Sequence, residues 1–220
     1  MASMDRGLHG PLEPQPDVYI PSPDQGFDFD AVKDLVIWDQ FGNRKRFHTL
    51  YQETKTIIIF VRHFLCYVCK EYVEDLAKIP RDYLQEAKVR LVVIGCAPHT
   101  YIREFRQETC FPHEFYCDPD RDLHKALGLR LDGTHGKASP HVKSSVISGV
   151  LQSTWRAVKS MHYQGDMMQQ GGQFIVGPGK KLHYAWRDRN SQDHTSVNQL
   201  LAEAGVQQIN LPNDPRIIQV

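Results

Sequence analysis

The chain has 220 residues, a length typical of one domain that can bury a full core. Its 26 Lys and Arg residues equal its 26 Asp and Glu residues, so the composition favours neither nucleic acid nor an anionic membrane as a partner. No stretch of the sequence approaches the roughly 18 apolar residues of a membrane span.

The N-terminus and the cysteines bear on the cellular compartment. Residues 1–7 have neither the basic region nor the apolar region of a secretion signal. The chain has five cysteines at irregular spacing, and in a protein without an export signal such thiols are expected to be reduced. We therefore expect a cytoplasmic protein in which any disulfide is transient and catalytic. The cysteines are Cys66, Cys69, Cys96, Cys110 and Cys117.

The N-terminal segment differs from the rest in composition. Residues 1–26 carry five prolines and few large apolar side chains, which predicts a flexible arm without chemistry of its own. We expect the folded domain over residues 27–205 and a loosely held C-terminal tail over residues 206–220.

The domain is predicted to open with a hairpin. Residues 32–38 and 44–48 are short strand-like runs joined by a polar turn that contains glycine. Residues 56–61 (Thr-Ile-Ile-Ile-Phe-Val) are β-branched and apolar, the composition of a strand buried on both faces. A helix is predicted from about residue 66 to residue 79, because apolar side chains recur there at helical spacing until a proline follows.

Strands and helices then alternate. Residues 89–95 predict a second buried strand, and a helix opened by a proline follows over residues 98–108. Residues 115–117 predict a short strand. The run 118–120 (Asp-Pro-Asp) is expected to cap a brief helix that ends at Gly128.

The last third of the chain begins with a predicted loop. Glycine and proline mark this loop over residues 130–143, and a long amphipathic helix is predicted over residues 147–161. Residues 173–176 and 182–186 predict a hairpin, and a helix over residues 197–204 ends at a glycine. This order of elements predicts an α/β protein with a mixed sheet flanked by helices, a thioredoxin-like fold with an insertion between its two halves.

The motif Cys66-Tyr-Val-Cys69 is the strongest chemical feature. It follows the buried strand 56–61 after a four-residue turn, so it falls in the first turn of the next helix. Unpaired N–H groups and the helix dipole stabilise a thiolate there. A Cys-x-x-Cys near a βαβ pattern indicates a redox motif. Arg62 and His63, just upstream, are candidates to add positive charge.

Two other interpretations of the dithiol stay open at this point. Cysteines are small apolar residues that pack well at a helix start, so both could belong to the core. A structural zinc site is the second alternative, but it needs four ligands and the motif supplies two. Cys110, His113 and Cys117 could complete the set, although their spacing lacks the pattern of a zinc knuckle. We therefore expect no metal and no cofactor.

Several further residues are weaker candidates for a chemical role. Cys96 follows the strand 89–95 and could approach the dithiol, but a buried core cysteine is the simpler interpretation. Arg121 and Arg187 could orient a substrate oxygen, although most such arginines are solvated or paired. The run 177–181 (Gly-Pro-Gly-Lys-Lys) lacks the spacing of a phosphate-binding loop and falls in a hairpin turn.

Three separated runs resemble one known family. They are 60–71 (FVRHFLCYVCKE), 111–121 (FPHEFYCDPDR) and 171–179 (GGQFIVGPG). In this order they resemble the peroxiredoxin-like 2 family of AhpC/TSA antioxidant enzyme domains, and most closely its 2C branch. The resemblance spans about residues 30–205. At the positions of the proline and threonine that precede the reactive cysteine of ordinary peroxiredoxins, this chain has Ile59 and His63.

The resemblance implies a thioredoxin-like fold and thiol-dependent reduction of a small peroxide or a protein disulfide. It implies that Cys66 occupies the position of the attacking residue and Cys69 that of its partner. An external thiol system, thioredoxin or glutathione, would then reduce the resulting disulfide. The alternative function is a non-enzymatic redox sensor or interaction module, in which oxidation of the same two cysteines changes shape or partner.

Overall fold

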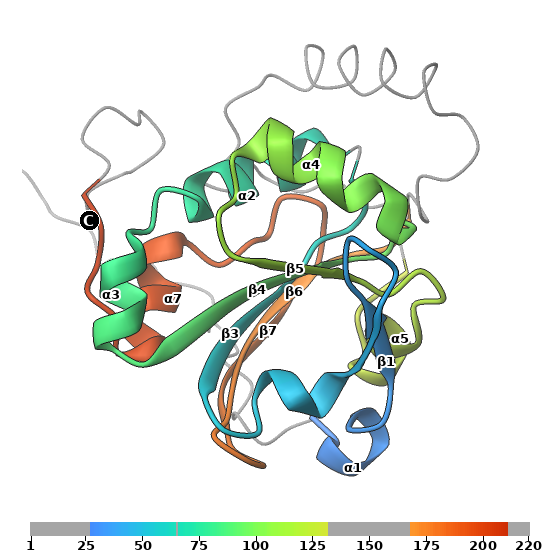
Figure 1. Cartoon of the computed structure of the whole chain (residues 1–220), viewed down its shortest axis with the longest axis horizontal. Helices are drawn as coiled ribbons and strands as arrows, with labels where there is room; N and C mark the ends of the chain where they lie inside the picture. Colours follow the sequence, from blue (N-terminus) through green and yellow to red (C-terminus); the bar gives the residue numbers. More distant parts are fainter. Residues whose placement is uncertain (1–26, 65, 132–167, 211–220) are drawn as a thin grey trace, which may run out of the picture.

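A seven-stranded sheet with helices on both faces forms the centre of the protein (Figure 1). The computed structural model describes residues 27–64, 66–131 and 168–210. The strand order is β2-β1-β5-β4-β3-β6-β7. The strands are β1 (Val36–Trp38), β2 (Arg44–Arg46), β3 (Lys55–Phe60), β4 (Val89–Gly95), β5 (Glu114–Cys117), β6 (Gly172–Val176) and β7 (Leu182–Arg187).

The sheet is mixed, as the alternation of elements predicted. β3, β4 and β5 are parallel neighbours, and helical segments connect them. The pairs β1–β2, β1–β5, β3–β6 and β6–β7 are antiparallel. Since β6 opposes β3 and β7 opposes β6, β7 runs in the same direction as β3. The carboxyl ends of β3, β4, β5 and β7 therefore lie at one end of the sheet.

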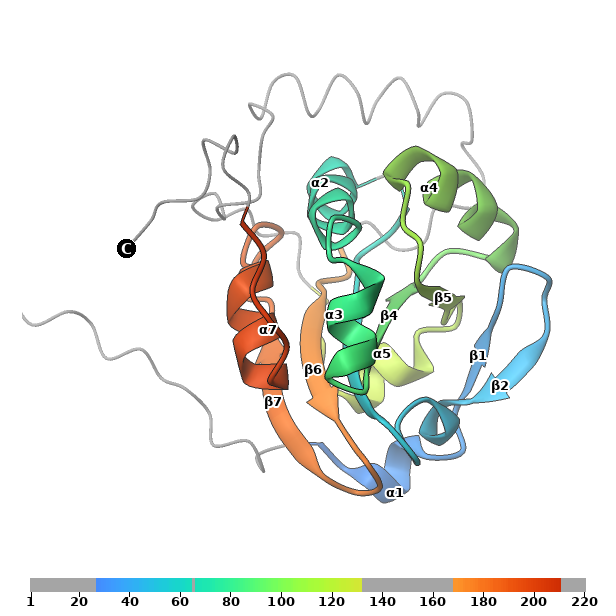
Figure 2. The ribbon, with the colours of Figure 1, turned by 60° about the vertical axis from the view of Figure 1, so that its left-hand side comes forward.

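The helices divide between the two faces, as Figures 1 and 2 show from two sides. On one face lie α2 (Tyr67–Leu76), α3 (Arg81–Glu86), α4 (Ile102–Thr109) and α7 (Val197–Ala204). On the other lie α1 (Phe29–Val32), the 3-10 turn η1 (Phe47–Leu50) and α5 (Asp122–Ala126). A second 3-10 turn, η2 (His99–Tyr101), leads into α4.

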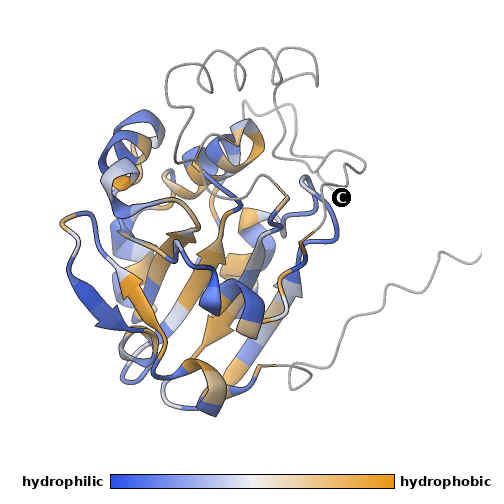
Figure 3. Ribbon diagram, turned by 90° about the vertical axis from the view of Figure 1, so that its right-hand side faces the viewer, coloured by the Kyte–Doolittle hydropathy of each residue, from blue (hydrophilic) through white to orange (hydrophobic). Residues whose placement is uncertain are grey.

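β3 contributes to both hydrophobic cores. Ile57 and Ile59 pack under α2 and α7, whereas Ile58 and Phe60 face α1, η1 and α5. All four side chains are almost fully buried. Alternation along a strand sends successive side chains to opposite faces, so a strand covered on both sides needs the unbroken apolar run seen in the sequence. The apolar central strands stand out in Figure 3.

Two local differences from the sequence prediction have clear causes. The predicted strand 32–38 begins later, at Val36, because the Asp28 carboxylate accepts hydrogen bonds from the N–H groups of Asp30 and Ala31 and caps the short helix α1. The predicted helix 66–79 ends at Leu76, and a separate helix, α3, begins directly after Pro80.

Other predicted elements agree with the structure. β4 spans the predicted residues, and the hairpin of β6 and β7 forms as expected. α7 ends at Gly205, which adopts the left-handed conformation that favours glycine. Packing continues past this residue, since Val206 and Ile209 are buried. Most of the predicted loop 130–143, the helix 147–161, the arm 1–26 and residues 211–220 lie outside the described residues.

Within the ranges that the structure describes, no helix has the length and apolar character needed to cross a membrane.

Candidate active site

The Cys66 sulfur lies at the N-terminus of α2. The chain leaves β3 at Phe60, turns, and places Cys66 at the capping position of the helix, with its carbonyl accepting the first helical hydrogen bond from Lys70. The Cys66 Sγ accepts a hydrogen bond from the backbone N–H of Cys69 at 3.4 Å. The sulfur thus takes the place that a serine or aspartate oxygen usually has at a helix start.

Arg62 brings positive charge to this sulfur. Its Nη1 donates to the Cys66 Sγ at 3.7 Å, and its Nε donates to the carbonyl of Gln169 at 2.9 Å. The Arg62 side chain is buried, so its charge is poorly screened by solvent. The predicted supporting residue is therefore beside the motif, fixed by the segment that leads into β6.

The environment favours the thiolate form of Cys66. A hydrogen bond from the Cys69 thiol lowers the pKa of Cys66, and the positive charges of His63 and Arg62 lower it further. Burial acts in the opposite direction, because Cys66 is only 4% exposed. The pKa nevertheless lies well below that of an ordinary cysteine.

Cys69 has the opposite character. Burial raises its pKa well above the usual value, and its hydrogen bond to the Cys66 sulfur and the nearby Cys66 charge raise it further. Both cysteines are free thiols in this structure. The pair therefore combines one stabilised thiolate with one protonated thiol that donates to it.

The turn before the motif packs against the neighbouring strand through Phe64. A Cβ at Gly95, the last residue of β4, would overlap the Phe64 ring, so this ring lies directly on the glycine backbone. The ring also stacks on Phe105 with centroids 5.0 Å apart and meets Phe115 edge-on at 5.3 Å. These contacts align the turn with the end of the sheet.

The remaining cysteines have separate environments. Cys96 is buried, and its thiol donates to the carbonyl of Arg62, so it supports the turn that carries this arginine. Burial raises the pKa of Cys117 to about 12. Cys110 is exposed at the C-terminal end of α4. Within the described ranges, no three His, Cys, Asp or Glu side chains gather in a group that could hold a metal ion.

The two weaker arginine candidates lie beside α5, Arg121 at its start and Arg187 at its end. The Arg187 guanidinium donates through Nε to the carbonyl of Leu127 and lies over the Phe174 ring, 5.3 Å from its centroid. Arg121 precedes α5 in a left-handed backbone conformation.

A buried carboxylate–imidazole pair lies at the same end of the sheet, and the sequence prediction missed it. His194 Nδ1 and Asp188 Oδ2 are 2.7 Å apart, and both side chains are almost completely buried. The His194 ring stacks on Tyr72 of α2, with centroids 4.6 Å apart. Its Nε2 is buried and has no hydrogen-bond partner among the described residues.

A polar network holds this pair in place. Gln173 of β6 donates to Asp188 Oδ1 at 3.1 Å and accepts from the Thr195 hydroxyl at 3.0 Å. The Tyr72 hydroxyl, in turn, donates to the Thr195 carbonyl at 2.7 Å.

The charges of the pair depend on each other. Burial lowers the pKa of His194, but the charge and hydrogen bond of Asp188, together with the Cys66 charge, raise it overall. Burial raises the pKa of Asp188 despite its contact with the imidazole. The influence of the Cys66 charge on the pKa of His194 indicates that this ring lies within electrostatic reach of the Cys66 sulfur.

A topological signal could have identified the pair. Phe60 of β3, Gly172 of β6 and Arg187 of β7 lie in one row across the sheet. Asp188 therefore leaves the sheet beside the point where β3 turns towards Cys66. Polar residues that follow strands ending at the same end of a sheet tend to converge. The sequence prediction placed β6 and β7 in a hairpin but did not pair them with β3.

Comparison with known proteins identifies the family. A family model described as AhpC/TSA antioxidant enzyme matches residues 75–190, more than half of the chain. The human protein named Peroxiredoxin-like 2C is 48% identical over 194 residues, which cover 86% of each chain. The mouse protein of the same name is 47% identical with the same coverage. The chain belongs to the peroxiredoxin-like AhpC/TSA family.

Solved structures agree with the family at the level of the fold. The crystal structure of Peroxidoxin BcpB from Mycobacterium tuberculosis aligns with a TM-score of 0.56, covering 80% of this chain and 94% of that one at 15% identity. The thioredoxin-like fold predicted from the order of elements is thus confirmed. Within the peroxiredoxin-like family this fold supports a redox role. The range matched by the family model begins after Cys69 and so does not include the dithiol. The case for a chemical role of the dithiol depends on its local geometry.

Proposed function

We propose that this peroxiredoxin-like protein is a thiol-dependent oxidoreductase of the cytoplasm that reduces a small peroxide or a protein disulfide through Cys66 and Cys69. The observation that carries the proposal is the Cys66 sulfur at the N-terminus of α2, within 3.7 Å of Arg62 and hydrogen-bonded by Cys69. A lowered thiol pKa makes the nucleophilic thiolate available at neutral pH.

The two cysteines would act in sequence. The Cys66 thiolate attacks one oxygen of a hydroperoxide, the O–O bond breaks, and the products are a Cys66 sulfenic acid and an alkoxide that takes up a proton. The Cys69 thiol then attacks the Cys66 sulfur and releases water, which leaves the 66–69 disulfide. The substrate gains two electrons and the dithiol loses two.

The first step consumes one proton, and His194 is a suitable source. The Asp188 carboxylate raises the pKa of this imidazole and so favours its protonated form, in a buried site where exchange with solvent is restricted. The Tyr72 ring on which it stacks belongs to α2, the helix that Cys66 caps. In the proposed cycle, His194 acts as the proton donor for the leaving alkoxide.

Turnover also requires an external reductant. A dithiol–disulfide exchange with a thioredoxin or glutathione system would return both electrons and regenerate the Cys66 thiolate. A protein disulfide as substrate would follow the same path, with a mixed disulfide at Cys66 in place of the sulfenic acid.

The two cysteine variants test this cycle. Cys66→Ser should abolish hydroperoxide consumption in the presence of a thioredoxin or glutathione system. Cys69→Ser should stop turnover after one equivalent and leave a Cys66 sulfenic acid that dimedone traps and mass spectrometry locates. The exposed Cys110, changed to Ser, is the matched control and should leave the rate unchanged. Unchanged consumption in Cys66→Ser would remove Cys66 from the mechanism.

A redox sensor is the second candidate, and the burial of the dithiol favours it. Cys66 is 4% exposed and Cys69 is fully buried, which limits the approach of a reducing protein. A sensor would react once per oxidation event and show no turnover with either reductant. Repeated consumption of hydroperoxide by the wild-type protein would exclude this alternative.

A further inference from the structure

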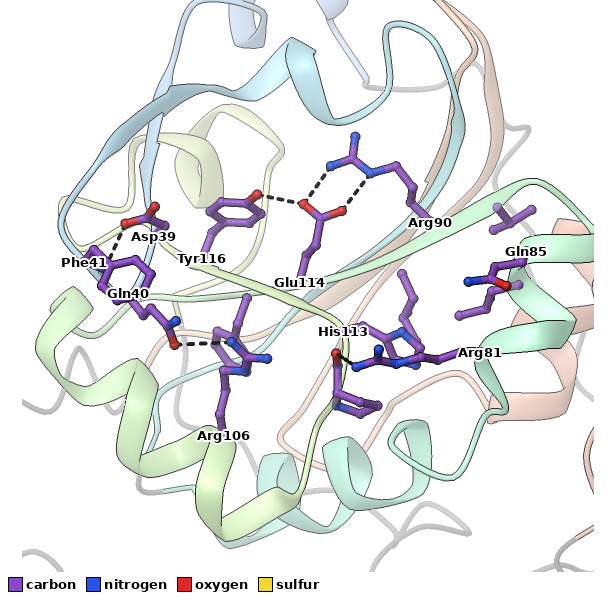
Figure 4. A pocket seen from close by; sticks show the side chains of 15 residues that line it. Asp39, Gln40, Phe41, Arg81, Gln85, Arg90, Arg106, His113, Glu114 and Tyr116 are labelled. Carbon is purple, nitrogen blue, oxygen red and sulfur yellow. Dashed lines mark hydrogen bonds and ion pairs between the residues drawn. The ribbon is translucent and has the colours of Figure 1, made fainter.

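A pocket of about 500 Å³ lies away from the dithiol, between α3, α4 and the turn that joins β1 and β2 (Figure 4). Its floor comes from the first three residues of β4 and of β5, Val89 to Leu91 and Glu114 to Tyr116. The dithiol follows the carboxyl end of β3, which is parallel to β4. The pocket and the dithiol therefore occupy opposite ends of the sheet.

Three arginines line this pocket, and one of them is neutralised within it. Arg90 forms a two-point ion pair with Glu114, with N–O distances of 2.8 and 2.7 Å. Asp39, the other carboxylate of the lining, accepts from the backbone N–H groups of Phe41 and Asn43 within its own turn. Arg90 therefore neutralises Glu114, whereas Asp39 keeps its single negative charge against the two remaining arginines.

Arg81 and Arg106 contact neutral acceptors. Arg81 Nη2 donates to the carbonyl of Pro112 at 2.8 Å, and Arg106 Nη1 donates to Gln40 Oε1 at 3.2 Å. These bonds orient the two guanidinium groups from α3 and α4 without cancelling their charge. The pocket thus keeps a positive potential at this side.

His113 lies between these two charges. One ring nitrogen is hydrogen-bonded to the backbone of Ile79, whereas Nε2 is buried and meets no partner among the described residues. Burial lowers the pKa of His113, and the charges of Arg81 and Arg106 lower it further. Figure 4 shows the ring beside Arg81, facing the same space. The protonation of this imidazole therefore responds to any charge that enters the space between the two arginines.

We propose that this pocket binds a small organic anion, with a carboxylate or phosphate head group held by Arg81 and Arg106 beside the His113 ring. A planar guanidinium group presents paired donors that match the oxygens of either head group. The apolar part of the ligand would rest on the side chains that line the rest of the pocket and on Phe41, which is 76% exposed at its rim. The apolar lining residues are Leu84, Val89, Leu91 and Phe115.

Binding would be linked to proton uptake. The charged groups that face His113 are Arg81 from α3, Arg106 from α4 and Glu114 from β5. Without a ligand, burial and the charges of the two arginines favour the neutral imidazole. An anion bound by the two arginines offsets their charge and raises the pKa of His113, which favours the protonated imidazole. Affinity should therefore fall as the pH rises through the pKa of His113 in the complex.

The test uses three matched probes on the 220-residue chain: phenyl phosphate, benzoate and uncharged benzamide. The His113 ring signals are followed by NMR, with His113→Gln as the assignment control. We expect either anion, but not benzamide, to shift these signals and to raise the pKa of His113. A response to one anion alone assigns the head group as phosphate or as carboxylate.

Arginine variants locate the site. Arg81→Gln and Arg106→Gln should each weaken binding of the responding anion about 10-fold or more, since a charged hydrogen bond is lost. Arg81→Lys keeps the charge and should retain part of the affinity. Arg103→Gln, an exposed position on the same helix as Arg106 but outside the pocket, should have no effect. Thermal unfolding of each variant verifies that it is folded.

Three results would overturn the proposal. They are the absence of any response to both anions at millimolar concentration, equal binding of benzamide and benzoate, and unchanged affinity in both glutamine variants. Because the readout is binding at His113, a failure here leaves the proposed dithiol cycle untouched, and loss of peroxide turnover leaves this pocket untouched.

Discussion

At the scale of single residues, Cys66 combines two roles that proteins usually give to different atoms. Its sulfur caps α2 and is also the atom that we propose reacts with the substrate. The same N–H group and positive charges that satisfy a capping atom also stabilise a thiolate. Local sequence was sufficient to predict this position, because the buried strand and the helical spacing bracket the motif within a few residues.

Arg62 should control how much of Cys66 is thiolate. Arg62→Met removes the charge 3.7 Å from the sulfur and keeps a side chain of similar length, so the pKa of Cys66 should rise. We expect the rate of Cys66 alkylation by iodoacetamide at pH 6 to fall about 3- to 10-fold. The rate is measured by peptide mapping across a pH series.

The control for this variant is Arg44→Met, which changes an exposed arginine on β2. It should leave the alkylation profile of Cys66 unchanged. If Arg62→Met has the same profile as the wild-type protein, the lowered pKa of Cys66 does not depend on this arginine.

At the scale of elements, the hairpin of β6 and β7 supports the site through its polar residues. Gln173 comes from β6 and Asp188 directly follows β7, and together they hold His194 against α2. The flanking glycines and the turn between them predicted both strands, but the pairing of β6 with β3 depends on the whole sheet. The network could therefore not be predicted from local patterns, which do not specify strand order.

His194 should affect the peroxide step more than the formation of the thiolate. His194→Gln removes the proton donor, so we expect sulfenic acid formation to slow by about 100-fold below the pKa of His194. The wild-type rate should decline as the pH rises through this raised pKa, since the imidazole then loses its proton, and the variant should lack this decline. Stopped-flow measurement of hydroperoxide reaction across pH provides the test.

His183→Gln is the matched control, because His183 belongs to β7 but bonds to the carbonyl of Gly177 at the opposite end of the hairpin. It should preserve the pH profile of the wild-type protein. A His194→Gln variant that keeps the same profile would show that the proton comes from another source. Urea unfolding of both variants separates loss of stability from loss of the proton.

At the scale of the whole molecule, two candidate sites lie at opposite ends of the sheet. The dithiol and the Asp188–His194 pair lie where β3 and β7 finish, and the arginine-lined pocket lies where β4 and β5 begin. The fold class could be predicted because strands and helices alternate regularly in the sequence. The pocket could not, since Arg81, Arg106 and His113 come from segments that only the tertiary structure brings together.

Because β3 is buried on both faces, truncating a side chain on either face should lower the free energy of unfolding by a similar amount. Ile58→Ala and Ile59→Ala each leave a cavity, one beside α1 and α5 and one beneath α2 and α7, so each should lower the free energy of unfolding by about 2–5 kcal/mol. Arg44→Ala on exposed β2 should change it by less than about 0.5 kcal/mol. Urea denaturation measures all three, and a cost below about 1 kcal/mol at either isoleucine would mean that its face is loosely packed.

The contact between Phe64 and Gly95 determines how the turn before Cys66 is positioned against the sheet. The turn that carries Arg62 and Cys66 is positioned by a space that β4 leaves open, because the aromatic ring occupies the volume where any other residue would have its Cβ. Even the smallest side chain at position 95 would push this ring, and the turn with it, away from the sheet. The position of Cys66 relative to the sheet therefore depends on the lack of a side chain at position 95 of β4.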